Sequence, residues 1–308
     1  MTSTLKVQNI QYTDGDSAIT IADGGGISNA LNLTGGISNI TNTTGGVVQE
    51  YSSGGTNYRS HSFLDVGTHR FSTSTALTID FLIVGGGGGS AKAQSNTVST
   101  GGAGAGGMVV ATSQTLTAGN YAIVVGAGGA KSTNDTSSAS NGGDSTFNGF
   151  TGTGGAGGPT YEGGARNGGS GAGGSESADP AGTSTQATYS GTTNVTGYGN
   201  AGGAGGDYDN GTAPFGSGGG GGAGGAGTAA NSTSGNTTAA GGVGRTNDFR
   251  TGSNITYAKG GHGCSGTING TTGVANTGDG AGGVSSGGGG NQNACDGGSG
   301  IVVIRYAI

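Results

Sequence analysis

Residues 216–227 read Gly-Ser-Gly-Gly-Gly-Gly-Gly-Ala-Gly-Gly-Ala-Gly, and stretches of this kind decide how the chain folds. Similar runs recur along the sequence, and glycine accounts for 80 of the 308 residues. Glycine loses more backbone entropy on folding than any other residue, so glycine-rich sequence normally forms flexible linkers. Here the runs are too numerous, and too regularly interleaved with apolar strands, to be linkers. The sequence therefore predicts that the backbone itself forms the packed core.

A glycine run can adopt the polyproline II conformation, which has three residues per turn and no internal hydrogen bonds. Its N–H and C=O groups point outward and need partners, which neighbouring runs can supply. Close approach requires faces without Cβ atoms, as at the axis of collagen. Residues 152–158, Gly-Thr-Gly-Gly-Ala-Gly-Gly, fit this requirement. We therefore predict a body of packed polyglycine II helices, with the purest glycine runs at its centre.

The composition excludes several classes of protein. Hydrophobic residues make up 30% of the chain and charged residues 8%, whereas disordered chains combine low hydrophobicity with high charge. The net charge is −6 and no basic run occurs, so we expect no nucleic-acid partner. No stretch approaches the ~18 apolar residues of a membrane span. The first residues lack the apolar core of a signal peptide.

Residues 1–50 differ from the rest of the chain in their sequence pattern. Gly-Gly-Ile-Ser-Asn occurs at 25–29 and again at 35–39, which is a ten-residue period. One chain of such turns buries little, but three chains wound around an axis could bury the apolar residues between the glycine pairs. We interpret residues 1–50 as a fibrous stem for attachment and homotrimerisation.

Beyond residue 50, short apolar and β-branched segments have the character of strands, and no segment has a helical period. The predicted strands cover residues 58–64, 68–72, 76–84, 107–111, 121–125 and 301–306. The turn at 117–120 predicts a hairpin. The last strand is expected to pair with residues 81–84 and 121–125. We thus predict an all-β, fibrous fold in which 51–308 form one glycine-rich domain. Its β platform would comprise 51–125 and 301–308, and 126–300 would form a polyglycine II body with apical loops.

Four segments resemble the glycine-rich domain of bacteriophage tail fibres and tip adhesins: residues 58–63, 81–89, 116–129 and 298–306. Residues 3–11 are similar to the N-terminus of marine phage fibre proteins. The resemblance implies polyglycine II packing, homotrimeric virion fibres, and binding of a host glycan or outer-membrane protein through apical loops. It also implies N-terminal attachment to other tail or virion proteins, a virion location, and synthesis in the host cytoplasm. Residues from about 160 to 297 match this family only in composition.

Motifs that suggest enzymes are explained by the glycine content. Gly102, Gly104 and Gly107 satisfy GxGxxG, but neither the helix nor the acidic residue of a dinucleotide site follows. Residues 283–287 satisfy GxSxG, yet no histidine follows them. We predict no catalytic residue and no cofactor.

Metal-binding signals are equally incomplete. Residues 207–211 begin like a calcium loop but lack the closing glutamate. His61 and His69 lie on adjacent predicted strands without a third ligand. We predict no metal site.

Seven aromatic residues lie between the later glycine runs: Tyr161, Tyr189, Tyr198, Tyr208, Phe215, Phe249 and Tyr257. An aromatic ring on a polar loop offers a rigid contact surface for sugars or proteins, although each can equally pack over its own loop. We predict that receptor-binding residues lie within this group. Cys264 and Cys295 could form a disulfide that closes a loop of about thirty residues, or remain two buried thiols.

These observations predict a non-enzymatic virion protein, a phage tail fibre or fibre-tip adhesin that binds the host surface. An alternative is a secreted bacterial surface or matrix protein with the same packing, ice binding being a remoter version. A polysaccharide depolymerase is a third possibility, and it requires paired carboxylates in a groove.

Overall fold

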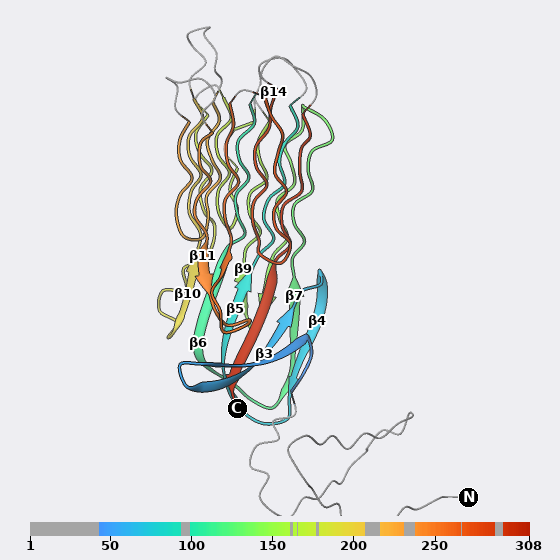
Figure 1. Ribbon diagram of the computed structural model, residues 1–308, viewed down its shortest axis with the longest axis vertical. Helices are drawn as coiled ribbons and strands as arrows, with labels where there is room; N and C mark the ends of the chain where they lie inside the picture. The colour runs from blue at the N-terminus through green and yellow to red at the C-terminus, as the bar shows by residue number, and fades with distance from the viewer. Residues whose placement is uncertain are drawn as a thin grey trace, which may run out of the picture. The chain divides into compact units, whose positions relative to one another are not determined.

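In the computed structural model, the larger β-sheets gather at one end of the folded unit and the glycine runs extend side by side away from them (Figure 1). The structure describes residues 43–93, 99–160, 163–164, 166–176, 179–206, 216–230, 238–265, 267–286 and 292–308. All of them belong to the unit Thr41–Ile308. These residues form fifteen β-strands and no helix, which confirms the predicted all-β fold. The first 42 residues of the predicted stem lie outside the described residues.

Two larger sheets, which we call the sandwich, contain eleven of the strands. The six-stranded sheet has the order β10 (Val195–Tyr198), β6 (Met108–Leu116), β5 (Leu77–Val84), β15 (Ile301–Ala307), β3 (Thr56–Phe63) and β2 (Val47–Ser53). The five-stranded sheet has the order β1 (Thr43–Thr44), β4 (Gly67–Thr73), β7 (Gly119–Val125), β8 (Ser145–Phe147) and β9 (Phe150–Gly152). The two small sheets pair β11 (Arg245–Asn247) with β12 (Ile255–Tyr257), and β13 (Thr267–Ile268) with β14 (Ser285–Ser286).

The apolar run in β5 is continuous because both faces of its sheet are covered. Phe81 and Ile83 pack between the two sheets of the sandwich, in a cluster that also contains Phe71 from β4. Leu82 and Val84 point to the opposite face. Alternate side chains of a strand point to opposite faces, so a strand that is buried on both sides shows no polar alternation.

All six predicted strands are present, but two predicted pairings are wrong. Residues 117–120 do not form a hairpin, because β6 and β7 lie in different sheets and this segment carries the chain from one sheet to the other. The last strand, β15, pairs with β5 as predicted, but its second neighbour is β3 rather than β7. β15 lies in the interior of the six-stranded sheet, and its side chains from Ile301 to Tyr306 are buried.

The boundaries between the predicted regions also shift. Residues 43–50, which the sequence places in the stem, form β1 and the first half of β2, and they pair with β4 and β3. The strands β8, β9 and β10 extend the sandwich into the predicted body. Conversely, the glycine runs 85–90 and 101–107, predicted as part of the platform, lie among the other glycine runs. We call these runs together the bundle.

Residues 85–90 show how the bundle is held together. Their N–H groups donate in rotation to three neighbouring runs, so that every third donor returns to the same neighbour. This is a period of three residues, whereas a β-strand has a period of two. The six bonds measure 2.9–3.1 Å and join Gly85 to Gly107, Gly86 to Gly143, Gly87 to Gly298, Gly88 to Gly104, Gly89 to Ser140 and Ser90 to Cys295.

The carbonyl groups of the same run accept from three further neighbours. The acceptor pairs are Gly86 with Gly155, Gly87 with Gly129, Gly88 with Ala281, Gly89 with Gly158 and Ser90 with Ser132. Three donor neighbours and three acceptor neighbours surround the run with six others. Residues 101–107 and 217–223 are each bonded to six runs in the same way. The purest glycine runs therefore lie at the centre of the bundle.

Glycine is required in these runs because neighbouring backbones come closer than a side chain allows. A Cβ atom placed on Gly89 would lie 2.5 Å from the carbonyl oxygen of Ala130, and one on Gly88 would lie still closer to that of Ala156. Where alanine does occur in the central runs, as at Ala103 and Ala105, its methyl group is fully buried. The bundle thus has a core in which backbone replaces most of the usual apolar side chains.

Candidate functional site

The end of the bundle farthest from the sandwich, which we call the far end, contains buried polar side chains. The short strand β14 marks this end (Figure 1), and Ser99 pairs with Ser285 of that strand. Ser99 Oγ donates to Ser285 Oγ at 2.8 Å, and Ser99 N–H donates to Glu176 Oε2 at 3.1 Å. Glu176 is only 4% exposed. Burial raises the pKa of the Glu176 carboxyl to about 8, so it is mostly protonated at neutral pH.

The two cysteines are free thiols, and of the two only Cys264 is buried, whereas Cys295 is partly exposed. Cys264 is fully buried at the far end, where its N–H donates to Ser217 Oγ at 2.8 Å. Burial raises the pKa of the Cys264 thiol to about 12. A thiol with this pKa is protonated at neutral pH and is a poor nucleophile.

Replacing Glu176 with glutamine is expected to change how stability depends on pH. The folded protein binds this proton more tightly than the unfolded chain, whose carboxyl has a pKa of 4.5. The contribution to stability is therefore fully present below pH 4.5 and is lost as the pH rises toward 8, by up to about 1.4 kcal/mol per pH unit. Glu176→Gln should remove this loss, so the variant should gain stability relative to wild type between pH 5 and pH 8. Urea denaturation at several pH values measures the difference.

Asp65→Asn is the matched control, because Asp65 is an exposed residue of the turn before β4. The stability difference between Glu176→Gln and wild type should depend on pH more strongly than the difference between Asp65→Asn and wild type. A Glu176→Gln variant whose difference from wild type is constant between pH 5 and pH 8 would contradict a protonated Glu176.

Four of the seven predicted receptor-binding aromatics are described, and all four lie at or near the sandwich rather than on far-end loops. Tyr257 is fully buried in β12 and Phe249 is 5% exposed. Tyr189 packs against Phe150, and its hydroxyl accepts from Thr151 N–H at 2.8 Å. Tyr198 is half-buried in β10. Packing thus holds three of these rings, and the guanidinium carbon of Arg245 lies 3.8 Å from the ring centroid of the fourth, Tyr198.

The other three aromatics, Tyr161, Tyr208 and Phe215, lie outside the described residues. The runs that lead into them are described, however. Gly206 and Gly216 flank residues 207–215, and Gly206 N–H donates to Gly216 O at 2.9 Å. The start of the calcium-like motif, residues 207–211, also falls outside the described part of the chain.

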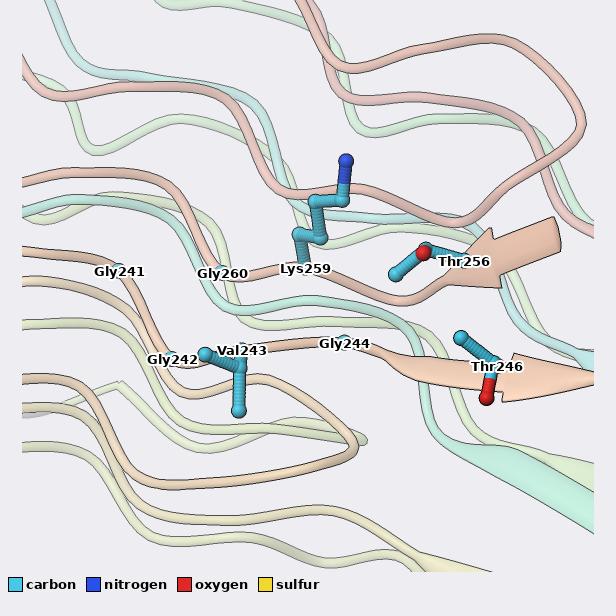
Figure 2. A pocket seen from close by; sticks show the side chains of 8 residues that line it. All are labelled: Gly241, Gly242, Val243, Gly244, Thr246, Thr256, Lys259 and Gly260. Carbon is cyan, nitrogen blue, oxygen red and sulfur yellow. The ribbon is translucent and has the colours of Figure 1, made fainter. Parts of the chain in front are cut away.

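A groove of about 370 Å³ lies beside β11 and β12, where the bundle meets the sandwich (Figure 2). Four glycines contribute backbone to its floor: Gly241, Gly242, Gly244 and Gly260. Thr246 comes from β11 and Thr256 from β12, while Lys259 stands along one rim and Val243 along the other.

The groove contains polar groups that the fold does not use. Within the described residues, the hydroxyl groups of Thr246 and Thr256 make no hydrogen bond. The Lys259 ammonium group makes neither a hydrogen bond nor an ion pair there. Lys259 is exposed, and the Val243 side chain is 66% exposed. The lining therefore offers one positive charge, two hydroxyl groups and a small apolar surface.

The sequence did not predict the groove or the role of Glu176. Lys259 and the two threonines belong to no motif, and the hairpin that aligns them, residues 245–257, is too short to have been recognised. The only signal was Ile-Thr-Tyr, a three-residue segment that alternates between apolar and polar residues and follows a series of turn residues, because its partner Arg-Thr-Asn is polar throughout.

Two histidines, His61 and His69, and the serine of the GxSxG pattern lie in packed or hydrogen-bonded positions. His61 is buried, and its Nδ1 lies 2.6 Å from Gly45 O. His69 Nε2 lies 2.6 Å from Asp65 O. Ser285, the serine of the GxSxG pattern, is 2% exposed. Within the described ranges no group of three His, Cys, Asp or Glu residues could hold a metal ion, and no helix is long and apolar enough to cross a membrane.

A family model described as a glycine-rich domain matches residues 64–307, which run from the end of β3 to the end of β15. No curated protein matches the chain.

Proposed function

The chain belongs to the glycine-rich domain family, and we propose that it serves as a non-enzymatic virion structural protein, a phage tail fibre or fibre-tip adhesin that binds the host cell surface. In this proposal the bundle is a packed array of polyglycine II helices. The observation that carries it is the hydrogen bonding of residues 85–90, with a period of three and six neighbours.

Such a bundle suits an adhesin because its core does not depend on the segments that connect the runs. Residues 207–215 and 231–237, for example, connect runs whose hydrogen bonds are made between backbone groups. Sequence changes in the connecting segments leave those bonds intact, as is usual for binding loops on a rigid scaffold. Host recognition can therefore vary while the scaffold stays the same.

The proposal extends to assembly and location. Residues 1–50 would contribute a stem through which three copies associate and attach to other tail or virion proteins. The protein would be made in the host cytoplasm and then reside in the virion. The support for this part is the ten-residue repeat at 25–39 and the resemblance of residues 3–11 to phage fibre N-termini.

We also propose that the protein has no enzymatic activity. This proposal is supported by the burial of Ser285, the serine of the GxSxG pattern, and of the Cys264 thiol. Incubation with host polysaccharide that releases new reducing ends would contradict it.

The proposed function is tested by adsorption of the labelled protein to bacterial cells. Replacing residues 207–215 with a Gly-Ser segment of the same length should abolish or strongly reduce adsorption while leaving the fold intact. The control is the same kind of replacement in the β8–β9 turn, at Asn148 and Gly149, near the sandwich. Equal adsorption of both variants, or adsorption by neither variant nor the wild type, would count against the proposal.

A secreted bacterial surface or matrix protein is the alternative that the same bundle would suit. Immunolabelling distinguishes the two, since an antibody against the bundle should label purified phage particles and not the envelope of uninfected cells.

A further inference from the structure

We infer that the groove beside β11 and β12 binds the carboxylate-bearing sugar residues of an acidic glycan. The inference rests on the proposed host-surface function and adds a ligand class and a site on the flank of the bundle. It depends on three properties of the groove: its charge, its unused polar groups and its size.

The charge of the groove differs from that of the chain. The chain has 16 acidic and 10 basic residues, yet the lining of the groove contains Lys259 and no acidic residue. Asp279 lies beside Lys259 but is 6% exposed, and its Oδ1 accepts from the Lys259 backbone N–H at 2.9 Å. The ammonium group itself makes no hydrogen bond within the described part of the chain. A ligand carboxylate would supply a charge-assisted hydrogen bond to it.

The remaining groups of the lining match the rest of a sugar ring. The hydroxyls of Thr246 and Thr256 can each donate and accept, as sugar hydroxyls require. Val243 and the Cα–H groups of the glycine floor form an apolar surface of the kind that covers the C–H face of a ring. A Cβ atom added at Gly244 would lie 2.8 Å from Thr256 Cγ2 and still closer to the Tyr257 carbonyl oxygen, so glycine at this position lets the backbone segments below the groove approach each other closely.

The size of the groove limits the ligand. A volume of about 370 Å³ is at the lower end of the range for small-molecule sites. One or two sugar residues of a longer chain would fit, with the chain continuing along the open flank of the bundle. Single-site affinity would be weak, and a fibre with several copies would gain from multivalency.

Binding is measured by isothermal titration and by NMR, with a glucuronate-containing oligosaccharide and a neutral glucose oligosaccharide of equal length. We expect the acidic oligosaccharide to bind, the neutral one to bind at least tenfold more weakly, and affinity to fall with added salt. Lys259→Met should weaken binding roughly tenfold or more, and Thr256→Val should weaken it severalfold. Lys131→Met is the matched control, since Lys131 is an exposed lysine outside the groove, and it should leave binding unchanged.

Three results would overturn the inference: no binding of the acidic oligosaccharide at millimolar concentration, equal binding of the neutral one, or equal losses in Lys259→Met and Lys131→Met. Cell adsorption is scored separately. Normal adsorption by Lys259→Met together with no acidic-glycan binding would reject the groove and leave the adhesin function standing. Glycan binding without adsorption to any cell would support the groove and reject the adhesin function.

Discussion

Gly88→Ala is expected to lower the free energy of unfolding by about 3 kcal/mol or more, or to prevent folding altogether. The added Cβ would meet the carbonyl oxygen of Ala156 in the centre of the bundle. Overpacking in an ordinary core typically costs about 1–3 kcal/mol because neighbouring side chains can move. Here the neighbour is backbone, and moving it would disturb hydrogen bonds to several runs at once. Urea denaturation, followed by circular dichroism and by exposure of the buried Cys264 thiol, measures the effect.

The control is Gly119→Ala in β7, where the nearest atom to an added Cβ would be Tyr121 Cε2 at 3.9 Å. This is an ordinary van der Waals distance, and the backbone of Gly119 does not have a positive φ. Its stability should change by less than about 1 kcal/mol. Similar losses in both variants would mean that glycine in the central run is not required for close packing.

Arg305→Met is expected to destabilise the sandwich by about 2–3 kcal/mol. The Arg305 guanidinium lies between two rings, 4.4 Å from the centroid of Tyr58 and 3.9 Å from that of Phe249. Its Nε donates to Asp80 Oδ2 at 3.0 Å, and its Nη1 donates to Asp248 Oδ1 at 3.3 Å. Methionine retains much of the packing but leaves two partly buried carboxylates without their partner. Thermal and urea denaturation at neutral pH measure the loss.

Two further variants separate the charge from the packing. In the Arg305→Met, Asp80→Asn double variant, part of the lost stability should return because one uncompensated carboxylate is removed. Arg59→Met disrupts the exposed pair with Glu50, whose side chains are 33% and 53% exposed, and should cost less than about 1 kcal/mol. If Arg59→Met proved as costly as Arg305→Met, burial of the Arg305 cluster would not be the reason for its effect.

The strands of the sandwich could be predicted from the sequence, whereas their pairing could not. Strand character is local, so the apolar segment at 301–306 is recognisable by itself. Pairing depends on which faces are buried by residues far away in the sequence. The glycine and asparagine at 119–120 are typical of a tight hairpin, yet the strands on either side bury their side chains in different sheets.

The positions of the aromatic residues could not be predicted from the sequence for a related reason. The hairpin at 245–257 has strands of only three residues, which are too short for alternation to separate a buried face from an exposed one. Phe249 and Tyr257 therefore looked like residues of polar loops, although they pack under the six-stranded sheet with Leu82 and Val303. Lys259 could not be recognised from the sequence either, because its place in the groove depends on the hairpin beside it.

Amide hydrogen exchange, resolved by residue with NMR, tests most directly whether glycine backbone forms the core of the bundle. The N–H groups of residues 85–90, 101–107 and 217–223 should exchange as slowly as those of β5, because each run is enclosed by six hydrogen-bonded neighbours. Exchange of these glycine amides at the rate of an unstructured chain, with β5 still protected, would contradict the account.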